Sequence, residues 1–532
     1  MANIAFSKEQ EDIFEYAEHG VLNMIVQAVA GAGKTTTLVE CANRIENDKK
    51  ILLLAHNRST KDTLKERIGD KSNVMICTLH GLGWRLFVEH FDFTPTIEED
   101  KYRNYINKNI NVLGSEEYQR LKKPLKLQYK SNVFELIDKS RSNLKQSEKE
   151  ITKMAKKKYG MSLIADECAF VAKVLKWGQS TTDVVDYMDL LWFPSEYGYF
   201  TKKYLADIIM LDEAQDASLA QQDVVSRCFK RNTRLFAFGD EDQCINSWAG
   251  SDTEAFNHLK DSDTFRREAK ELPLTTNYRC GKNIIEYAKH FVNNNIHARD
   301  DAPDGEVNYD MHLDDVKNGD MILCRNSAPL MKVFNKGMQL AKKMYFRGEN
   351  MGKNLQSAID CANGNTIPEI IFSLKQRLIS MWDYLNQDEN LDPKETMLDP
   401  KIVTLYDTIK TIENLPKTVE NRNDFEKFIK DVFSDEGKDG IQLSTIHKAK
   451  GLEADNVFVI CSSLIPSSLA TLDWQRKEEQ HLLYVMATRP KLSLNFISEK
   501  EIVPFKCFQN VNAFYNELLI IKQEVNESKK EE

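Results

Sequence analysis

A short run of glycine, alanine, lysine and threonine near the amino end has the residue types that bind phosphate. The segment reads Ala28-Val-Ala-Gly-Ala-Gly-Lys-Thr35 and lies between an apolar run and a helical pattern. In such a strand–loop–helix context, backbone N–H groups cradle anionic oxygens at the start of the helix. We expect Lys34 to meet the β and γ phosphates of a nucleotide and Thr35 to ligate Mg²⁺. The rest of the predicted cradle is Ala28, in place of the usual first glycine, with Ala30, Gly31, Ala32, Gly33 and Thr36.

A second chemical feature is an acidic pair after an apolar run. The segment Ile208-Ile-Met-Leu-Asp-Glu-Ala-Gln-Asp216 places Asp212 and Glu213 at the end of a predicted buried strand. There Asp212 can hold the magnesium ion and Glu213 can polarise the attacking water. Most acidic pairs are solvated surface, so the pair gains its meaning from the apolar strand before it and the phosphate loop upstream. Together the two segments predict a site that hydrolyses a nucleoside triphosphate.

The elements that must position these residues follow from the apolar pattern. We expect a helix over 8–19, a strand over 23–28, a helix from Lys34, and further strands over 51–55 and 207–211. Continuous apolar runs are typical of parallel strands covered on both faces, and their alternation with helices indicates an open α/β sheet. A second α/β half begins near Gly281, with strands expected over 321–324, 441–444 and 457–461.

The charge is distributed unevenly along the chain. The 532 residues carry a net charge of −9, which is not typical of a nucleic-acid binder. Residues 101–160 nevertheless contain 16 Lys and Arg against 6 Asp and Glu, an excess of ten positive charges. This helical stretch is either a solvated insertion or a surface that faces phosphates. The second interpretation reconciles an acidic protein with a nucleic-acid partner.

The length, with 42% hydrophobic residues, is enough for several cores. A polar, helical interruption at 351–438 is punctuated by Asn363-Gly364 and Asp392-Pro393, which favours an inserted accessory domain. The division that we predict is a first core at 1–88 and 182–280, a basic helical insertion at 89–181, a second core at 281–350 and 439–515, the helical accessory insertion at 351–438, and a charged tail at 516–532. We expect the last residues of this tail, 522–532, to be frayed.

The spacing of the cysteines and the length of the apolar runs indicate the compartment in which the protein is expected. The ten cysteines are scattered without a CxxC pair, and no apolar run approaches the length of about 18 residues that a membrane span needs. We therefore expect a reduced, cytoplasmic protein without a membrane partner.

Phosphoryl transfer also needs a cation over the γ-phosphate, and two arginines in distinctive segments are candidates for it. They occur in Thr276-Asn-Tyr-Arg279 and in Tyr484-Val-Met-Ala-Thr-Arg489. With Gly239-Asp-Glu-Asp-Gln243, with the segment from Thr445 to Glu453 (TIHKAKGLE), and with Gln10 ahead of the loop, the ordered set resembles the UvrD/Rep group of superfamily 1 helicases. Further matches are Thr78-Leu-His-Gly81 and Asp186-Tyr-Met-Asp-Leu-Leu191, and the resemblance spans residues 6–491. That family also has alanine at the position of Ala28.

The resemblance implies two RecA-like P-loop cores with parallel sheets, each carrying a mainly helical insertion. It also implies roles for individual residues. Gln10 would read adenine, Tyr278 would stack on that base, and Glu453 would meet the ribose. Gln243 would sense the γ-phosphate, while Arg279 and Arg489 would reach it from the second core, a contact worth about 10³–10⁵ in rate.

The resemblance also suggests where a single strand of DNA lies. Asn246 stands where the family has tyrosine and Ala249 where relatives often carry arginine, whereas Trp248 can still stack on a base. Polar residues near strand ends often only cap helices, which is the alternative for the other candidates. These candidate strand contacts are Asn57, Arg58, Thr78, His80, Arg325, Asn326, Thr445 and His447.

The function that we predict is an ATP-dependent DNA helicase that uses Mg²⁺ and moves 3′ to 5′ on single strands. Its partners would be single-stranded DNA, junctions of single and double strand, and proteins of replication or recombination. One alternative is a translocase that strips proteins from single strands with little unwinding. Another is a DNA-binding nucleotide switch, which the complete hydrolytic set disfavours.

Overall fold

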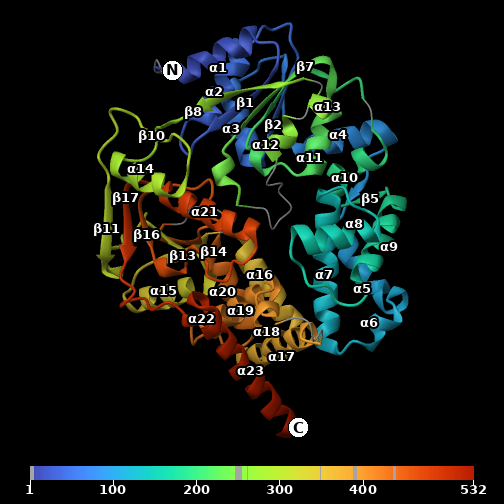
Figure 1. Ribbon diagram of the computed structural model, residues 1–532, viewed down its shortest axis with the longest axis vertical. Coiled ribbons are helices and arrows are strands. Elements are labelled where there is room, and N and C mark those ends of the chain that lie inside the picture. The colour runs from blue at the N-terminus through green and yellow to red at the C-terminus, as the bar shows by residue number, and fades with distance from the viewer. Residues whose placement is uncertain are drawn as a thin grey trace.

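The computed structural model contains two α/β halves, each with a helical region at one side (Figure 1). It describes residues 5–199, 201–245, 255–260, 262–265, 267–347, 349–387, 392–434 and 439–531. No helix among these residues is both long and apolar enough to cross a membrane.

The first half contains a six-stranded sheet with the order β3-β2-β6-β7-β1-β8, and all its neighbouring strands are parallel. Its strands are β1 (Asn23–Ala28), β2 (Ile51–Ala55), β3 (Val74–Thr78), β6 (Ala206–Leu211), β7 (Phe229–Gly239) and β8 (Ala269–Leu274). The helices beside it are α1 (Lys8–His19), α2 (Lys34–Arg44), α3 (Arg58–Ile68), α4 (Leu79–Phe91), α10 (Asp189–Glu196), α11 (Leu219–Ser226), α12 (Ala255–Leu259) and α13 (Ser262–Phe265). Every residue of β2 is buried, as its continuous apolar run predicts.

The second half contains a seven-stranded parallel sheet with the order β11-β17-β16-β12-β15-β13-β14. Its strands are β11 (Glu306–Met311), β12 (Met321–Cys324), β13 (Met344–Arg347), β14 (Phe433–Ser434), β15 (Ile441–Thr445), β16 (Ala454–Val459) and β17 (Pro490–Ile497). Its helices are α14 (Lys282–Ala288), α15 (Ser327–Gln339), α21 (Asp473–Ala487), α22 (Lys506–Gln509) and α23 (Val511–Glu531). The predicted α/β class with two parallel sheets is confirmed. The strand expected over 457–461 lies three residues earlier, because its residues 454–456 pair with β17.

Short strand pairs connect these elements. Strand β4 (Thr96–Ile97) pairs with β5 (Val184–Val185), and β9 (Thr276–Asn277) pairs with β10 (His297–Ala298).

The first helical region extends from the first sheet. It contains α5 (Lys101–Leu113), α6 (Glu116–Arg120), α7 (Lys123–Ser142), α8 (Glu148–Lys153), a π-helical turn η1 (Met154–Lys158) and α9 (Glu167–Ser180). Part of its positive charge is internal. The Arg141 guanidinium is buried and contacts Asp186 at 2.7 Å and Asp189 at 2.9 Å, and the Lys101 ammonium contacts Asp189 at 2.6 Å. These two cations are therefore paired in the interior, where loss of either one would leave a buried carboxylate without its partner.

The second helical region covers the second sheet. It contains α16 (Glu349–Cys361), α17 (Ile367–Leu385), α18 (Pro393–Thr396), α19 (Pro400–Glu413) and α20 (Arg422–Val432). The predicted breaks fall between helices, since Gly364 has a positive φ of 93° and the Asp392 side chain caps α18. Its buried side chains belong to the same hydrophobic cluster as those of the second sheet.

The expectation of a frayed carboxyl-terminal tail is wrong. Residues 511–531 form α23, on which Phe514, Leu518, Ile521 and Val525 are buried. Their spacing puts four apolar side chains on one helical face, and burial of that face stabilises the helix. The Lys522 ammonium of this helix lies 2.6 Å from the Asp383 carboxylate of α17.

Candidate nucleotide site and strand-binding surface

The predicted phosphate loop joins β1 to α2 at the carboxyl edge of the first sheet. Gly31 and Gly33 have φ of 67° and 77°, a conformation that favours glycine. A Cβ on Gly31 would lie 2.7 Å from Asn277 Nδ2 and 2.9 Å from Arg279 Cβ. The same neighbours brace the loop, since Asn277 Nδ2 donates to the Ala30 carbonyl at 2.6 Å. Asn277 and Arg279 therefore leave no room for a side chain at Gly31.

The acidic pair lies opposite the loop, at the end of β6. The Lys34 ammonium is 3.7 Å from a Glu213 carboxylate oxygen. Burial and the neighbouring Glu213 carboxylate raise the pKa of Asp212. Burial opposes ionisation of Glu213, but Lys34 and Lys450 hold its pKa below the usual value. Glu213 has a φ of 50°, unusual for a residue with a side chain, and such strain often accompanies functional sites.

Lys34 itself sits among carboxylates. Burial disfavours its ammonium form, yet Glu213, Asp240 and Asp212 together raise its pKa. The Asp240 carboxyl is also buried, and burial raises its pKa to about 6. The site thus collects one lysine and three carboxyl groups, of which those of Asp212 and Asp240 are buried.

Gln243 links this cluster to the second half of the molecule. Its amide nitrogen donates to Asp240 Oδ2 at 2.6 Å, and its amide oxygen accepts from Arg489 Nη2 at 3.3 Å. Arg489 is 1% exposed and also donates to the Val485 and Leu452 carbonyls. Burial, followed by the nearby Arg279 guanidinium, lowers the pKa of Arg489 to about 10. Arg489 therefore reaches the first core from the end of α21.

Arg279 and Glu453, both predicted to contact the nucleotide, contact each other. Arg279 Nε lies 2.8 Å from Glu453 Oε2, and Arg279 Nη1 donates to the Thr488 carbonyl at 3.2 Å. Tyr278 is 38% exposed, so its ring is accessible to a ligand.

Both the oxygen and the nitrogen of the Gln10 side-chain amide form hydrogen bonds within the protein. Its oxygen accepts from the Ser7 backbone N–H at 3.0 Å in the capping box of α1. Its nitrogen donates to Thr37 Oγ1 at 2.9 Å, which ties α1 to α2 beside Gly33. Thr35 and Thr36 are half-buried in the first turn of α2. All predicted nucleotide residues thus lie around one loop, while their individual roles remain predictions.

Three contacts between the cores were not predicted from the sequence. The Lys450 ammonium lies 2.6 Å from Asp216 and donates to the Gln243 carbonyl at 2.6 Å. The Tyr484 hydroxyl accepts from the Ala30 backbone N–H at 2.9 Å. His481 Nδ1 lies 2.8 Å from the Cys244 carbonyl oxygen. Lys450, Tyr484 and Asp216 all occur in the segments that carry the resemblance, but sequence spacing alone does not show which residues pair.

The strand candidates of the first core lie at the ends of two neighbouring strands, since Ala55 pairs with Thr78. Asn57 Oδ1 caps α3 by accepting from Thr60, and Thr78 Oγ1 caps α4 by accepting from Gly81. These two residues thus have the capping role that the alternative interpretation gives them. Arg58 is exposed, and the His80 ring packs edge-on against Tyr187 with centroids 6.2 Å apart. Trp248, Asn246 and Ala249 lie outside the described residues.

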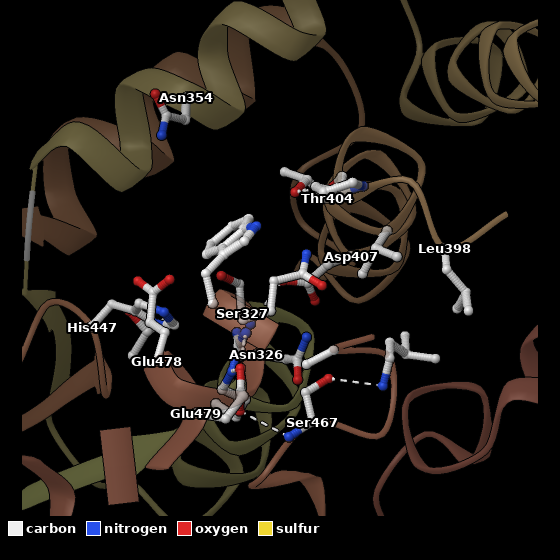
Figure 2. A pocket seen from close by; sticks show the side chains of 18 residues that line it. Asn326, Ser327, Asn354, Leu398, Thr404, Asp407, His447, Ser467, Glu478 and Glu479 are labelled. Carbon is white, nitrogen blue, oxygen red and sulfur yellow. Dashed lines mark hydrogen bonds and ion pairs between the residues drawn. The ribbon is translucent and has the colours of Figure 1, made fainter. Parts of the chain in front are cut away.

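The strand candidates of the second core meet in one cavity of about 390 Å³, shown in Figure 2. Arg325, Asn326, Thr445 and His447 line it, together with side chains of α16 and α19. Arg325 is held by Glu479, with Nη2 and Nε at 2.6 and 2.8 Å from one carboxylate oxygen.

Sequence reasoning missed the other residues that line this cavity, among them Trp474 and Glu478. Glu478 Oε1 is buried without a hydrogen-bond partner, and burial raises the pKa of this carboxyl to about 8. Both residues lie on α21, the helix that leads into the segment from Tyr484 to Arg489. That position is the only signal in the sequence that could have suggested them.

Comparison with known proteins agrees with this arrangement. Residues 7–264 match the model of the UvrD/REP helicase N-terminal domain, and residues 369–501 match that of the UvrD-like helicase C-terminal domain. The chain belongs to the UvrD/Rep-like family of superfamily 1 helicases. The resemblance inferred from the motifs is thereby confirmed, as are the two RecA-like cores of this family.

Individual members of the UvrD/Rep-like family are similar to this chain at a moderate level. F-box DNA helicase protein 1 of Schizosaccharomyces pombe is 24% identical over 504 residues, which is 88% of this chain and 55% of that protein. The probable DNA helicase II homolog of Mycoplasma pneumoniae is 25% identical over 301 residues, covering 53% of this chain and 41% of that protein. ATP-dependent DNA helicase PcrA of Bacillus subtilis is 25% identical over 304 residues, covering 52% and 38%. The chain thus spans about half the length of these relatives or less.

Proposed function

We propose that this protein is an ATP-dependent DNA helicase that moves 3′ to 5′ on single-stranded DNA and unwinds duplex. The observation that carries the proposal is that Lys34, Glu213 and Gln243 of the first core lie with Arg279, at the junction of the two cores, beside Arg489 of the second. A site divided between two cores can convert hydrolysis into relative motion of those cores. The helicase names of the relatives and the family membership support DNA as the track. The protein would act on DNA inside the cell.

In this proposal the loop from Ala28 to Thr36 binds the phosphates of ATP and Lys34 contacts the β and γ phosphates. Thr35 and Asp212 would hold Mg²⁺, and Glu213 would orient the attacking water. The residues fit a divalent cation, because Asp212 is buried beside the Glu213 carboxylate, and this burial and neighbouring charge raise the pKa of Asp212. When bound, Mg²⁺ neutralises charge on the phosphates and favours ionised Asp212.

Gln243, Arg279 and Arg489 would connect hydrolysis to movement. Because Arg489 contacts Gln243, loss of the γ-phosphate would change the contacts of a residue in each core. Arg279 would exchange its Glu453 partner for the phosphate, which would free Glu453 to meet the ribose. Gln10 and Tyr278 would contact the base, as in the family.

The DNA strand would cross from the first core to the second. Asn57, Arg58, Thr78 and His80 would contact it on one side, and Trp248 would stack on a base. Arg325, Asn326, Thr445 and His447 would contact it on the other. Stacking of one base on an aromatic ring is worth about 1–3 kcal/mol, which is similar to the cost of opening a base-pair step.

Strand displacement tests the proposal. Fluorescent duplexes with a 3′ or a 5′ single-stranded tail are mixed with the protein, ATP and Mg²⁺, and Lys34→Ala serves as the inactive control. Opening of the 3′-tailed duplex alone supports both activity and polarity. ATP hydrolysis on single strands without opening of either duplex would favour the protein-stripping translocase. Binding of DNA without appreciable hydrolysis would favour the nucleotide switch.

A further inference from the structure

One carboxyl group that lines the cavity of Figure 2 is buried without its hydrogen bonds. Glu478 is 6% exposed, and its Oε1 has no hydrogen-bond partner within the described part of the chain. The neighbouring Glu479 differs, because its carboxylate accepts from the Arg325 guanidinium at 2.6 Å and from the Ser467 backbone N–H at 2.8 Å. Burial of an unpaired polar group costs free energy, so native proteins rarely contain one without a reason. Glu478 therefore points to a ligand that supplies hydrogen-bond donors.

A second side chain of the same cavity also has an unpaired polar atom. The indole Nε1 of Trp474 is buried and has no hydrogen-bond partner among the residues that the structure describes. Trp474 and Glu478 are four residues apart on α21, and residues at this spacing lie on one face of a helix. The Trp474 side chain is half-buried, so part of its ring remains accessible. One helical face thus presents an aromatic ring and an unpaired carboxyl group to the cavity.

The cavity has the position and the size to receive one base of a DNA strand. Its strand candidates lie at the carboxyl ends of the neighbouring strands β12 and β15. Figure 2 shows Glu478 close to His447 on one side, with Asn354 of α16 and Thr404 of α19 on another. Its volume of about 390 Å³ falls in the range of about 300–1,000 Å³ that is usual for pockets of small organic ligands. A nucleobase therefore fits beside the residues that would hold the strand.

The hydrogen-bonding groups of DNA decide which part of the strand can pair with Glu478. The phosphates and deoxyriboses within a strand offer acceptors only, and the phosphates repel a carboxylate. The N–H donors of a strand are all on its bases. Among the four bases, guanine alone carries two N–H donors side by side, at N1 and at the 2-amino group. A carboxylate accepts through both of its oxygens, so guanine matches it at two points.

We propose that this cavity selects guanine in the DNA strand, with the base stacked on Trp474 and its N1–H and 2-amino group donating to the Glu478 carboxylate. The inference rests on the proposed function, because it takes the strand to cross this cavity. Stacking on an aromatic ring tolerates every base, whereas hydrogen bonds to a base edge distinguish one base from another. The protein would thus hold a strand more tightly at each guanine that enters the cavity.

The charge state of Glu478 makes this selection depend on pH. Burial raises the pKa of its carboxyl to about 8, although nearby cations oppose the shift. A neutral carboxyl has one O–H donor and loses the match to the two donors of guanine. The preference for guanine should therefore rise by roughly eightfold from pH 7 to pH 8.5, as the ionised fraction grows. The charged and titratable groups that face Glu478 are Arg325, Glu479, Lys139, Lys450, Asp407 and His447.

Binding of thymine oligonucleotides with a single guanine at each successive position tests the proposal. Fluorescence anisotropy at pH 8.5 should find a position at which guanine tightens binding by at least about fivefold over thymine. Inosine, which lacks the 2-amino group, should lose most of this gain at the same position, whereas 7-deazaguanine, which keeps both donors, should retain it. Equal affinity for guanine and thymine at every position would overturn the proposal, and so would inosine that binds as tightly as guanine. Failure of the protein to bind any single strand would refute the proposed function itself.

Variants of α21 assign the effect to Glu478. Glu478→Gln keeps the shape of the side chain but replaces one acceptor with a donor, so the preference for guanine should fall below about twofold and no longer change with pH. Asp473→Asn is the matched control, because it removes one negative charge from a fully exposed position on the same helix and should leave the preference intact. Trp474→Ala should weaken binding of guanine and thymine alike at the selected position. A preference that persists undiminished in Glu478→Gln would overturn the proposal.

Discussion

Removal of the Lys450 ammonium should separate the two cores in the absence of nucleotide. In the structure this ammonium contacts both carboxylate oxygens of Asp216, at 2.6 and 2.8 Å, and the Gln243 carbonyl at 2.6 Å. The Asp216 side chain is 3% exposed and that of Lys450 14% exposed. Lys450→Met keeps much of the side-chain length and removes the charge. The variant leaves a buried carboxylate without its cation for as long as the cores stay together.

Breaking a buried ion pair from one side costs about 3–5 kcal/mol when the other charge stays buried. Separation of the cores relieves that cost, because water then reaches Asp216. At about 1.4 kcal/mol per factor of ten, the equilibrium between closed and open forms should shift towards the open form by a factor of about 10² to 4 × 10³.

Energy transfer between dyes on the two halves measures the shift. Val21→Cys and Val503→Cys carry the dyes in a Cys361→Ser background, since Val21 and Val503 are 67% and 59% exposed. Lys448→Met is the control, because it removes the same charge from an exposed position two residues away. We expect lower transfer efficiency for Lys450→Met and no change for Lys448→Met. Equal efficiencies for Lys450→Met and the parent would refute the reasoning that this ion pair holds the cores together.

Three further predictions concern catalysis, pH and folding. Glu213→Gln should slow single-turnover ATP hydrolysis by about 10²–10⁴ while a fluorescent nucleotide still binds, and unimpaired hydrolysis would exclude Glu213 as the residue that orients water. Glu478 has a folded-state pKa of about 8, above its unfolded value, so the folded state holds more protons and stability should fall as pH rises between the two values. Glu478→Gln should flatten this slope in melting curves from pH 5 to 9, and an unchanged slope would show that another group titrates. Leu518→Ala should cost about 2–5 kcal/mol of unfolding free energy, whereas Leu519→Ala should cost under about 0.5 kcal/mol, because Leu518 is 0% and Leu519 42% exposed. Similar denaturation midpoints for the two variants would contradict the packing of α23.

The sequence predicts the sheets well because buried parallel strands are continuous apolar runs. The strand over 51–55 agrees with β2 residue for residue, and the strand over 207–211 begins one residue earlier, at Ala206. The predicted strand over 457–461 differs from β16, which begins at Ala454. The first residues of β16, including Ala454 and Asp455, are polar or small, and only their pairing with β17 makes them part of the sheet. Local pattern does not contain that partner.

The candidate site was predictable as a set of residues but not as a set of contacts. Lys34 and Glu213 face each other as the motifs suggest. The Arg279–Glu453 pair joins residues far apart in sequence, and so does the Lys450–Asp216 pair. Such pairs depend on how the two halves meet, which no periodicity encodes. The tail was misjudged for a related reason, because the charges of 522–532 obscured the apolar spacing of Leu518, Ile521 and Val525.

During synthesis on the ribosome, the two faces of the first sheet become covered at different times. On one face, the hydrophobic cluster is complete once Phe265 has been synthesised, since all its buried members lie between Ile25 and Phe265. On the other face, the cluster also contains Ile284, Ile296, Tyr484 and Ala487. That face thus stays partly uncovered while about two hundred further residues are made. Exposed apolar surface of this kind attracts chaperones and promotes aggregation. Fragments that end before Tyr484 should therefore be less soluble than the full chain, although they contain the entire first sheet.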